Sequence, residues 1–219
     1  MTAVILLGHG SRDPRASDAM RSFVVELRDH AMHHTVEIAF LDHNRPTLQE
    51  AVDALPVAES DVVVVPMLLS QAFHAKSDVP AAITALRTHK RVRVADPVGS
   101  VDALALSAAS GLPGPYVLAF SGTSDPLAQR DLASLAERVG AATATPVTVG
   151  YVTQAVPDVP TAIAESGAGG VICYTLFPGM FTDRIAQAAA EAGIPCSQPL
   201  WRHEALAHAV LEVVGRLGR

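Results

Sequence analysis

Cysteine is scarce in this chain of 219 residues, which holds only Cys173 and Cys196. The two are far apart in the sequence and form no Cys-x-x-Cys motif, so neither a cysteine zinc site nor an iron–sulfur cluster within one chain is supported. Charged residues make up only 17% of the chain, and its formal net charge of −6 comes without a run of basic residues. This charge pattern argues against nucleic acid as a partner.

Long apolar runs are also absent. The runs that occur are about as long as β-strands, well short of the roughly 20 residues that cross a bilayer. Met1 leads directly into a strand-like segment without a basic region and cleavage site, so we expect no signal peptide. We therefore expect a cytoplasmic protein that does not use a membrane. Hydrophobic residues make up 49% of the chain, which suits a buried core in one sizeable domain or two small ones.

Strand-like apolar runs alternate with amphipathic stretches along the whole chain. The predicted strands cover residues 4–7, 36–41, 62–69, 92–95, 116–120, 147–152 and 171–177. The predicted helices cover residues 16–32, 47–55, 79–87, 102–109, 127–139, 161–165, 182–192 and 204–217. This alternation predicts an α/β fold of parallel strands with right-handed crossovers.

The second half of the chain repeats the first. Matching landmarks are Asp13-Pro14 with Asp125-Pro126, Pro46 with Pro157, and Pro97 with Pro199. The joint lies in residues 110–115, where glycine and proline cannot continue a helix. We predict two similar flavodoxin-like lobes, residues 1–112 and residues 113–219, each a parallel sheet flanked by helices, with a cleft between them. Such an internal pseudo-dimer favours a monomer.

Two histidines follow predicted strands of the first copy. His9 ends the first strand in Gly8-His9-Gly10-Ser11-Arg12, and His74 follows the strand at residues 62–69. Ligands of parallel α/β sheets bind beyond the carboxyl ends of the strands, and imidazole is a common ligand of divalent first-row metals. The second copy has Ser121 in place of His9 and Phe181 at or beside the His74 position. The scaffold recurs without the histidines, which favours a chemical role over a pair of buried structural histidines.

Further polar groups accompany these histidines. Gly10 allows close approach of a ligand, and Arg12 offers a bidentate clamp for a carboxylate or phosphate; the alternative is a helix cap at Ser11 beside a solvated arginine. Lys76 is a substrate contact or an ordinary polar loop residue. Asp42, His43 and Asn44 end the second strand, and one of them is a candidate for metal transfer or proton acceptance, with the choice open.

These residues resemble a known family. The segments Gly8-His9-Gly10-Ser11-Arg12, Phe40-Leu41-Asp42-His43 and Pro66-Met67-Leu68-Leu69 with His74 are similar to sirohydrochlorin chelatases of the CbiX/SirB type. The resemblance implies insertion of Fe²⁺ or Co²⁺, with Ni²⁺ as a further option, into sirohydrochlorin or a related tetrapyrrole for siroheme or cobalamin synthesis. It makes His9 and His74 the metal-binding and catalytic residues and requires no organic cofactor. The substrate-binding residues that we predict are Gly10, Ser11, Arg12, Asp42 and Lys76.

Two other functions fit parts of this pattern. A metal or tetrapyrrole carrier would use the same cleft without catalysing a reaction. A histidine phosphotransferase or phosphatase would place His9 and Arg12 after a strand, but its phosphate pocket needs several arginines, and the sequence offers only Arg12 and Arg15 nearby. Multiple-turnover metal insertion distinguishes the enzyme from the carrier.

Overall fold

The computed structural model describes residues 2–30, 34–69, 78–99 and 101–217. The chain forms two compact units, one of Met1–Gly99 with Ala207–Arg219 and the other of Ser100–Leu206. In the described part of the chain, no helix combines the length and the apolar character needed to cross a membrane.

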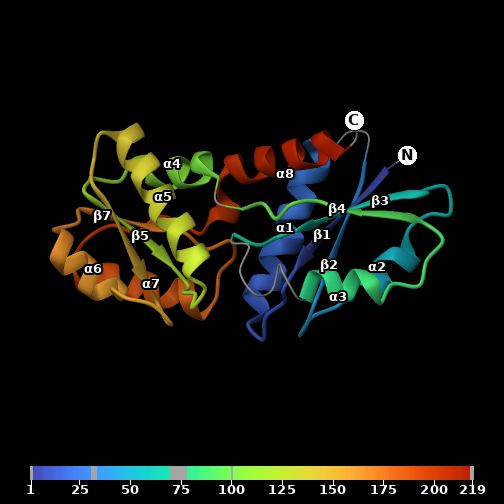
Figure 1. The fold of residues 1–219 in the computed structure, drawn as a ribbon, viewed down its shortest axis with the longest axis horizontal. Coiled ribbons are helices and arrows are strands. Elements are labelled where there is room, and N and C mark those ends of the chain that lie inside the picture. Colours follow the sequence, from blue (N-terminus) through green and yellow to red (C-terminus); the bar gives the residue numbers. More distant parts are fainter. Residues whose placement is uncertain (1, 31–33, 70–77, 100, 218–219) are drawn as a thin grey trace. The chain divides into compact units, whose positions relative to one another are not determined.

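The first unit is built on a four-stranded parallel sheet. Its strands lie in the order β2 (Thr35–Phe40), β1 (Thr2–Gly8), β3 (Asp61–Pro66) and β4 (Arg91–Val94). Its helices are α1 (Pro14–His30), α2 (Leu48–Ala54), α3 (Val79–Thr84) and most of α8 (Glu204–Leu217), as Figure 1 shows. The central strands are covered on both faces, which explains why they are apolar at nearly every position.

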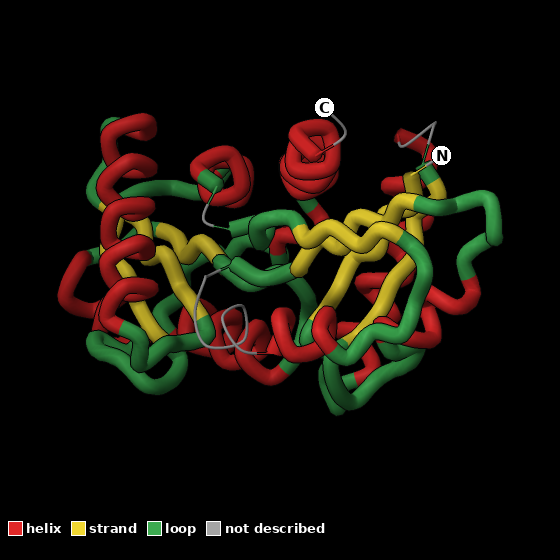
Figure 2. The backbone as a smooth tube through the Cα atoms, turned by 45° about the vertical axis from the view of Figure 1, so that its right-hand side comes forward, coloured by secondary structure: helices red, strands yellow, loops and turns green. Residues whose placement is uncertain are grey.

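The core of this unit lies on both sides of the sheet. Ala3, Ile5 and Leu7 of β1 point to the face on which α2 and α3 pack. Val4 and Leu6 point to the opposite face and are equally buried. Side chains alternate between the faces of a strand, so the unbroken apolar run fills two layers of core. Figure 2 shows helices on both sides of the strands.

The second unit repeats this architecture with three parallel strands. They lie in the order β6 (Val147–Tyr151), β5 (Tyr116–Phe120) and β7 (Gly170–Cys173). The helices α6 (Val159–Ser166) and α7 (Met180–Glu191) share one core with the sheet, and α4 (Asp102–Ala109) packs on α5 (Pro126–Thr143) and on β7. Cys196 forms a β-bridge with Val171, so the free edge of β7 is partly covered. The predicted α/β fold of two parallel sheets is confirmed.

Two of the predicted strands are too long. The apolar run at 62–69 ends as a strand at Pro66, and the run at 171–177 ends at Cys173. The residues that follow are still buried, Met67 and Leu69 in the first unit and Tyr174 in the second. At these positions the apolar residues reflect burial in the core. The hydrogen bonds between strands end earlier, because the chain leaves the sheet there.

The compact units do not coincide with the two sequence copies. The first copy ends in α4, yet α4 packs within the second unit; the second copy ends in α8, yet Ala207–Arg219 belong to the first unit. Each unit therefore takes its last helix from the other copy. The predicted bounds of 1–112 and 113–219 describe the duplication of the sequence and stay a prediction.

Candidate metal and substrate site

The loops that follow β1 and β2 are joined through their backbones. The Leu41 N–H donates to the Gly8 carbonyl and the Asp42 N–H donates to the His9 carbonyl, both at 2.9 Å. Because β1 and β2 are adjacent and parallel, both loops leave the same edge of the sheet. The backbones of His9 and Asp42 are therefore neighbours at the carboxyl edge of the first unit.

Gly10 is required where these loops cross. Its φ is +93°, and a Cβ built on it would lie 1.8 Å from the carbonyl oxygen of Asp42. Any side chain would push the His9 loop away from the Asp42 loop. The structure thus gives Gly10 a role in holding the two loops together, and its predicted contact with the substrate stays a prediction.

Ser11 is held by hydrogen bonds on both sides. Its N–H donates to Oδ1 of Asn44 at 2.7 Å, and its hydroxyl accepts from the Asp13 N–H at 3.0 Å. The helix α1 begins only at Pro14, so residues 10–12 form a loop in front of it. The Ser11 N–H is therefore engaged by Asn44 and not aimed at an anion. This bracing role of Asn44 is not predicted from the sequence.

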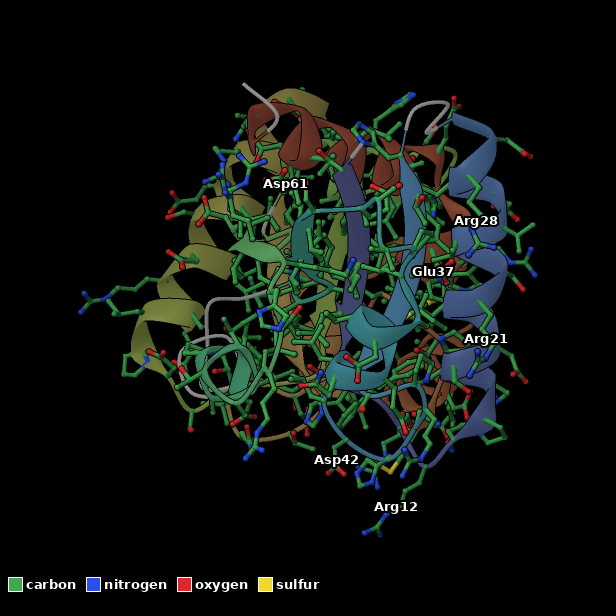
Figure 3. The ribbon with its side chains drawn as sticks, turned by 90° about the vertical axis from the view of Figure 1, so that its right-hand side faces the viewer. Arg12, Arg21, Arg28, Glu37, Asp42 and Asp61 are labelled. Atoms are coloured by element: carbon green, nitrogen blue, oxygen red, sulfur yellow. The ribbon has the colours of Figure 1, made fainter. Side chains whose placement is uncertain are left out.

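Arg12 is exposed, and Figure 3 shows its side chain extending outward near Asp42 at the carboxyl edge. Arg15 is committed elsewhere, because its guanidinium donates three bonds of 2.6 to 3.1 Å to the Asp13 carboxylate. These bonds hold the pKa of Asp13 below its ordinary value. Of these two arginines, Arg12 extends into solvent, and its contact with a substrate carboxylate stays a prediction.

The Asp42 carboxylate is oriented by the next residue. His43 donates from its N–H to Oδ1 at 2.7 Å, and its Nε2 lies 3.4 Å from Oδ2. His43 adopts a left-handed backbone with φ of 61°, uncommon for a residue other than glycine. The Asp42 side chain is 62% exposed, while His9 is half-buried with its Nδ1 shielded from solvent. The edge thus presents an open carboxylate beside the His43 imidazole, and carboxylate and imidazole are groups that first-row divalent metals accept.

The second unit is an internal control for this site. The Val152 N–H donates to the Phe120 carbonyl and the Thr153 N–H to the Ser121 carbonyl, which reproduces the loop pairing of the first unit. Gly122 has φ of +127°, and its Cβ would lie 2.0 Å from the Thr153 oxygen. The side chains differ: Ser121, Ser124, Thr153, Gln154 and Ala155 stand in place of His9, Arg12, Asp42, His43 and Asn44. The backbone is repeated, and the imidazole, carboxylate and guanidinium side chains are not.

His74 and Lys76 lie outside the described residues. The chain leaves β3 beside β1, where the Met67 N–H donates to the Leu7 carbonyl at 2.8 Å, and it is described again from Asp78. Among the residues that the structure does describe, no cluster of three or more His, Cys, Asp and Glu side chains is arranged to hold a metal. A shared metal between His9 and His74 stays a prediction.

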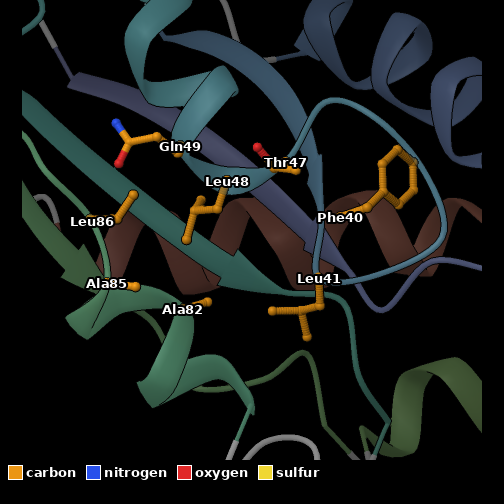
Figure 4. Close-up of a pocket in the computed structure, with 8 residues that line it drawn as sticks. All are labelled: Phe40, Leu41, Thr47, Leu48, Gln49, Ala82, Ala85 and Leu86. Atoms are coloured by element: carbon orange, nitrogen blue, oxygen red, sulfur yellow. The ribbon is translucent and has the colours of Figure 1, made fainter.

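A small, mostly apolar pocket adjoins this edge (Figure 4). Its lining comes from the end of β2, from α2, and from α3 and the residues after it: Phe40, Leu41, Thr47, Leu48, Gln49, Ala82, Ala85 and Leu86. The side chain of Gln49 is fixed by the Arg87 backbone, which it meets at 2.9 and 3.2 Å. With no ionisable group in its lining, the pocket offers room beside Asp42 and no chemistry of its own.

Comparison with known proteins identifies the family. The model of the CbiX family matches the chain twice, over residues 3–110 and residues 115–217. The chain belongs to the CbiX family. The predicted resemblance is thereby confirmed, and both halves of this CbiX chain contribute to the match.

Relatives with assigned names are similar over part of their length. A sirohydrochlorin cobaltochelatase of Priestia megaterium is 39% identical over 85 residues, 38% of this chain and 27% of that protein. A sirohydrochlorin ferrochelatase of Bacillus subtilis is 30% identical over 147 residues, 61% of this chain and 56% of that protein. The match to this chain thus covers between about a quarter and somewhat over half of the length of these relatives.

Solved structures share the fold over nearly the whole chain. SirB from Bacillus subtilis with Fe³⁺ matches with a TM-score of 0.84 at 24% identity, covering 98% of this chain and 94% of that one. CbiX, described as the terminal enzyme of siroheme biosynthesis in denitrifying bacteria, matches with a TM-score of 0.68 at 18% identity and covers 99% of both chains. At these identities the matches show a common fold.

Replacing Asn44 tests the brace beside His9. Asn44→Ala removes the acceptor of the Ser11 N–H and should cost about 1 kcal/mol of stability. For the chelatase activity proposed below, we expect metal insertion to slow roughly tenfold, because the loop that carries His9 loses a hydrogen bond that holds it in place. Urea unfolding and initial rates measure the two effects. The control is Ala155→Asn, which adds an amide at the equivalent place in the second unit and should leave the rate unchanged; equal rates for Asn44→Ala and wild type would contradict the brace.

Proposed function

We propose that this protein is a chelatase that inserts Fe²⁺ or Co²⁺ into sirohydrochlorin or a closely related tetrapyrrole, for siroheme or cobalamin biosynthesis. The observation that carries the proposal is the asymmetry of the duplication. Both units repeat one backbone, but Ser121, Thr153 and Gln154 of the second unit stand where the first has His9, Asp42 and His43. The names of the cobaltochelatase and ferrochelatase relatives support this choice of reaction.

The chemistry asks three things of the protein. It must take a divalent metal from water, accept two pyrrole N–H protons, and hold the macrocycle while the metal enters. In this proposal His9 and Asp42, with His74, present the metal, because imidazole and carboxylate bind these ions while leaving coordination positions open. Histidine also titrates near neutral pH, so a site imidazole is suited to accept a pyrrole proton.

The geometry favours Asp42 over His43 as the direct metal ligand. The Asp42 backbone is bonded to His9, and its carboxylate is largely exposed, whereas His43 turns its ring toward that carboxylate. We assign His43 the task of orienting Asp42. Arg12, exposed at the same edge, is assigned to the substrate carboxylates.

Absorbance spectra of sirohydrochlorin test the reaction. Protein at a small fraction of the substrate concentration is mixed with Fe²⁺, Co²⁺ or Ni²⁺ without oxygen, and the rate is compared with that of the metal alone. A multiple-turnover rate well above the background identifies a chelatase and shows its preferred metal. A spectral change that stops at one equivalent per protein identifies a carrier, and no interaction rejects both.

A further inference from the structure

The fold brings the two cysteines of the chain together in the second unit. Cys173 ends β7, and Cys196 lies in the segment after α7, where it forms a parallel β-bridge with Val171. The Val171 N–H donates to the Pro195 carbonyl and the Ser197 N–H donates to the Val171 carbonyl, both at 2.9 Å. Both cysteines are free thiols. Two residues far apart in the sequence are thus neighbours at one edge of the sheet.

The register of this bridge puts both thiols on one face of the sheet. Cys196 faces the same way as Val171, its bridge partner, and Cys173 does so because side chains alternate along a strand. On that face Cys173 belongs to the core that the sheet shares with α6 and α7, and Cys196 packs against this core. Cys173 is fully buried and Cys196 is partly exposed, so solvent reaches the pair through Cys196.

The two thiols hydrogen bond each other. This hydrogen bond lowers the pKa of the Cys173 thiol below its ordinary value, although burial acts in the opposite direction. The same contact, together with burial, raises the pKa of the Cys196 thiol. Two adjacent thiolates repel each other, and a cation bound between them removes that repulsion.

A pair of hydroxyls supports the buried sulfur. Oγ1 of Thr175 lies 3.3 Å from Sγ of Cys173 and 3.0 Å from Oγ1 of Thr182. The Thr175 hydroxyl can therefore donate to a thiolate at Cys173 while it accepts from Thr182. Hydrogen bonds of this kind orient the ligands of a metal and tune their affinity.

The first unit shows that the scaffold does not need these thiols. Pro66 pairs with the central strand at the place where Cys173 does so in the second unit. Val94 pairs with β3 at the place where Cys196 bridges β7. Neither proline nor valine offers a side chain that binds metals. The same backbone thus forms without either cysteine, so the pair is not a requirement of the fold.

The number and kind of the donors select the ligand. Structural Zn²⁺ takes four ligands, and among the described residues no third His, Cys, Asp or Glu completes a metal site with the two thiols. A soft monovalent ion such as Cu⁺ prefers thiolates and is held by two of them. In regular parallel strands this diagonal relation separates the Cα atoms by about 8 Å, whereas a disulfide spans less than about 7 Å. The register therefore favours an ion between the sulfurs over a direct S–S bond.

We propose that Cys173 and Cys196 form a two-thiolate site for a soft monovalent cation, Cu⁺ above all. Binding replaces the two S–H bonds by two S–Cu bonds and releases two protons, with no change in the oxidation state of copper or sulfur. The site lies within the second unit alone and does not depend on the proposed chelatase reaction.

Competition with bicinchoninate, a chelator that is coloured when it holds Cu⁺, tests the site without oxygen and with ascorbate as reductant. The wild type should take one equivalent of Cu⁺ from the chelator and develop an ultraviolet thiolate-to-copper band. Cys196→Val installs the residue that the first unit has at this place and should weaken Cu⁺ binding by at least about 100-fold, because one of two bonds is lost. Thr175→Val keeps both thiols and should weaken binding roughly tenfold. One equivalent of Cu⁺ should raise the thermal midpoint of the wild type and not that of Cys196→Val.

Val94→Cys is the matched control, because it adds a thiol at the equivalent place in the first unit, where Pro66 cannot complete a pair. It should create no second tight site for Cu⁺. Cu⁺ that stays with the chelator in the presence of the wild type would overturn the inference, and so would unchanged binding in Cys196→Val. Zn²⁺ bound as tightly as Cu⁺ would also overturn it, because two thiolates alone favour the softer ion. Metal insertion is measured in a separate assay, so each of these results leaves the proposed function as it stands.

Discussion

His9→Ala is expected to lower the rate of metal insertion by a factor of at least about 100, the usual size of the loss when a group that moves a proton or binds a reacting ion is removed. His9 is half-buried in a loop whose backbone carbonyl bonds Asp42, and that backbone bond does not need the ring. The free energy of unfolding should therefore change by no more than about 1 kcal/mol.

Ser121→Ala is the matched control, because Ser121 makes the same backbone bond at the equivalent place in the second unit. Initial rates with Fe²⁺ and Co²⁺ should be close to wild type in Ser121→Ala and lost in His9→Ala. Thermal unfolding of both variants should overlay on the wild type. Turnover that survives in His9→Ala would remove this imidazole from the mechanism, whatever the behaviour of the control.

The fold can be predicted from the sequence because buried parallel strands and the helices between them leave a simple pattern of apolar residues along the chain. Runs such as residues 62–65, buried on both faces, are apolar without interruption, and the segments between them carry helical periodicity. The ends of the runs are less informative. Met67 and Tyr174 are buried just past the last paired residue, so burial alone extends a predicted strand beyond its hydrogen bonds.

Some features of the site can likewise be predicted from the sequence, and others cannot. The proximity of His9 and Asp42 follows from one rule about the carboxyl edges of adjacent parallel strands. The Asn44 brace and the left-handed His43 depend on the path of a single loop, which periodicity does not encode. A local signal existed, because Asn44 and Asp42 are replaced by Ala155 and Thr153 in a copy that keeps the backbone. The exchange of final helices had no such signal, since the apolar residues of α4 and α8 predict that each helix is buried but not which sheet it packs near.

Gly10→Ala is expected to destabilise the protein strongly. The new Cβ would lie 1.8 Å from the Asp42 oxygen, in a backbone conformation with φ of +93° that side chains disfavour. Relief requires the loops after β1 and β2 to separate, which breaks the bond from the Asp42 N–H to the His9 carbonyl. Overpacking, strain and a lost hydrogen bond together should cost about 2 to 4 kcal/mol, and urea unfolding measures the loss.

Two other glycines separate the causes of that loss. Gly111 has φ of +81° with no atom within 4 Å of its Cβ position, so Gly111→Ala carries only the backbone strain, about 1 kcal/mol. Gly122→Ala repeats the clash at 2.0 Å in the second unit and should destabilise the protein as much as Gly10→Ala. Only Gly10→Ala should slow metal insertion at temperatures where every variant is folded, because only its loops carry His9 and Asp42. If Gly10→Ala proved as stable as Gly111→Ala, the crossing of the loops would not be a fixed part of the site, and the pairing of His9 with Asp42 would lose its structural basis.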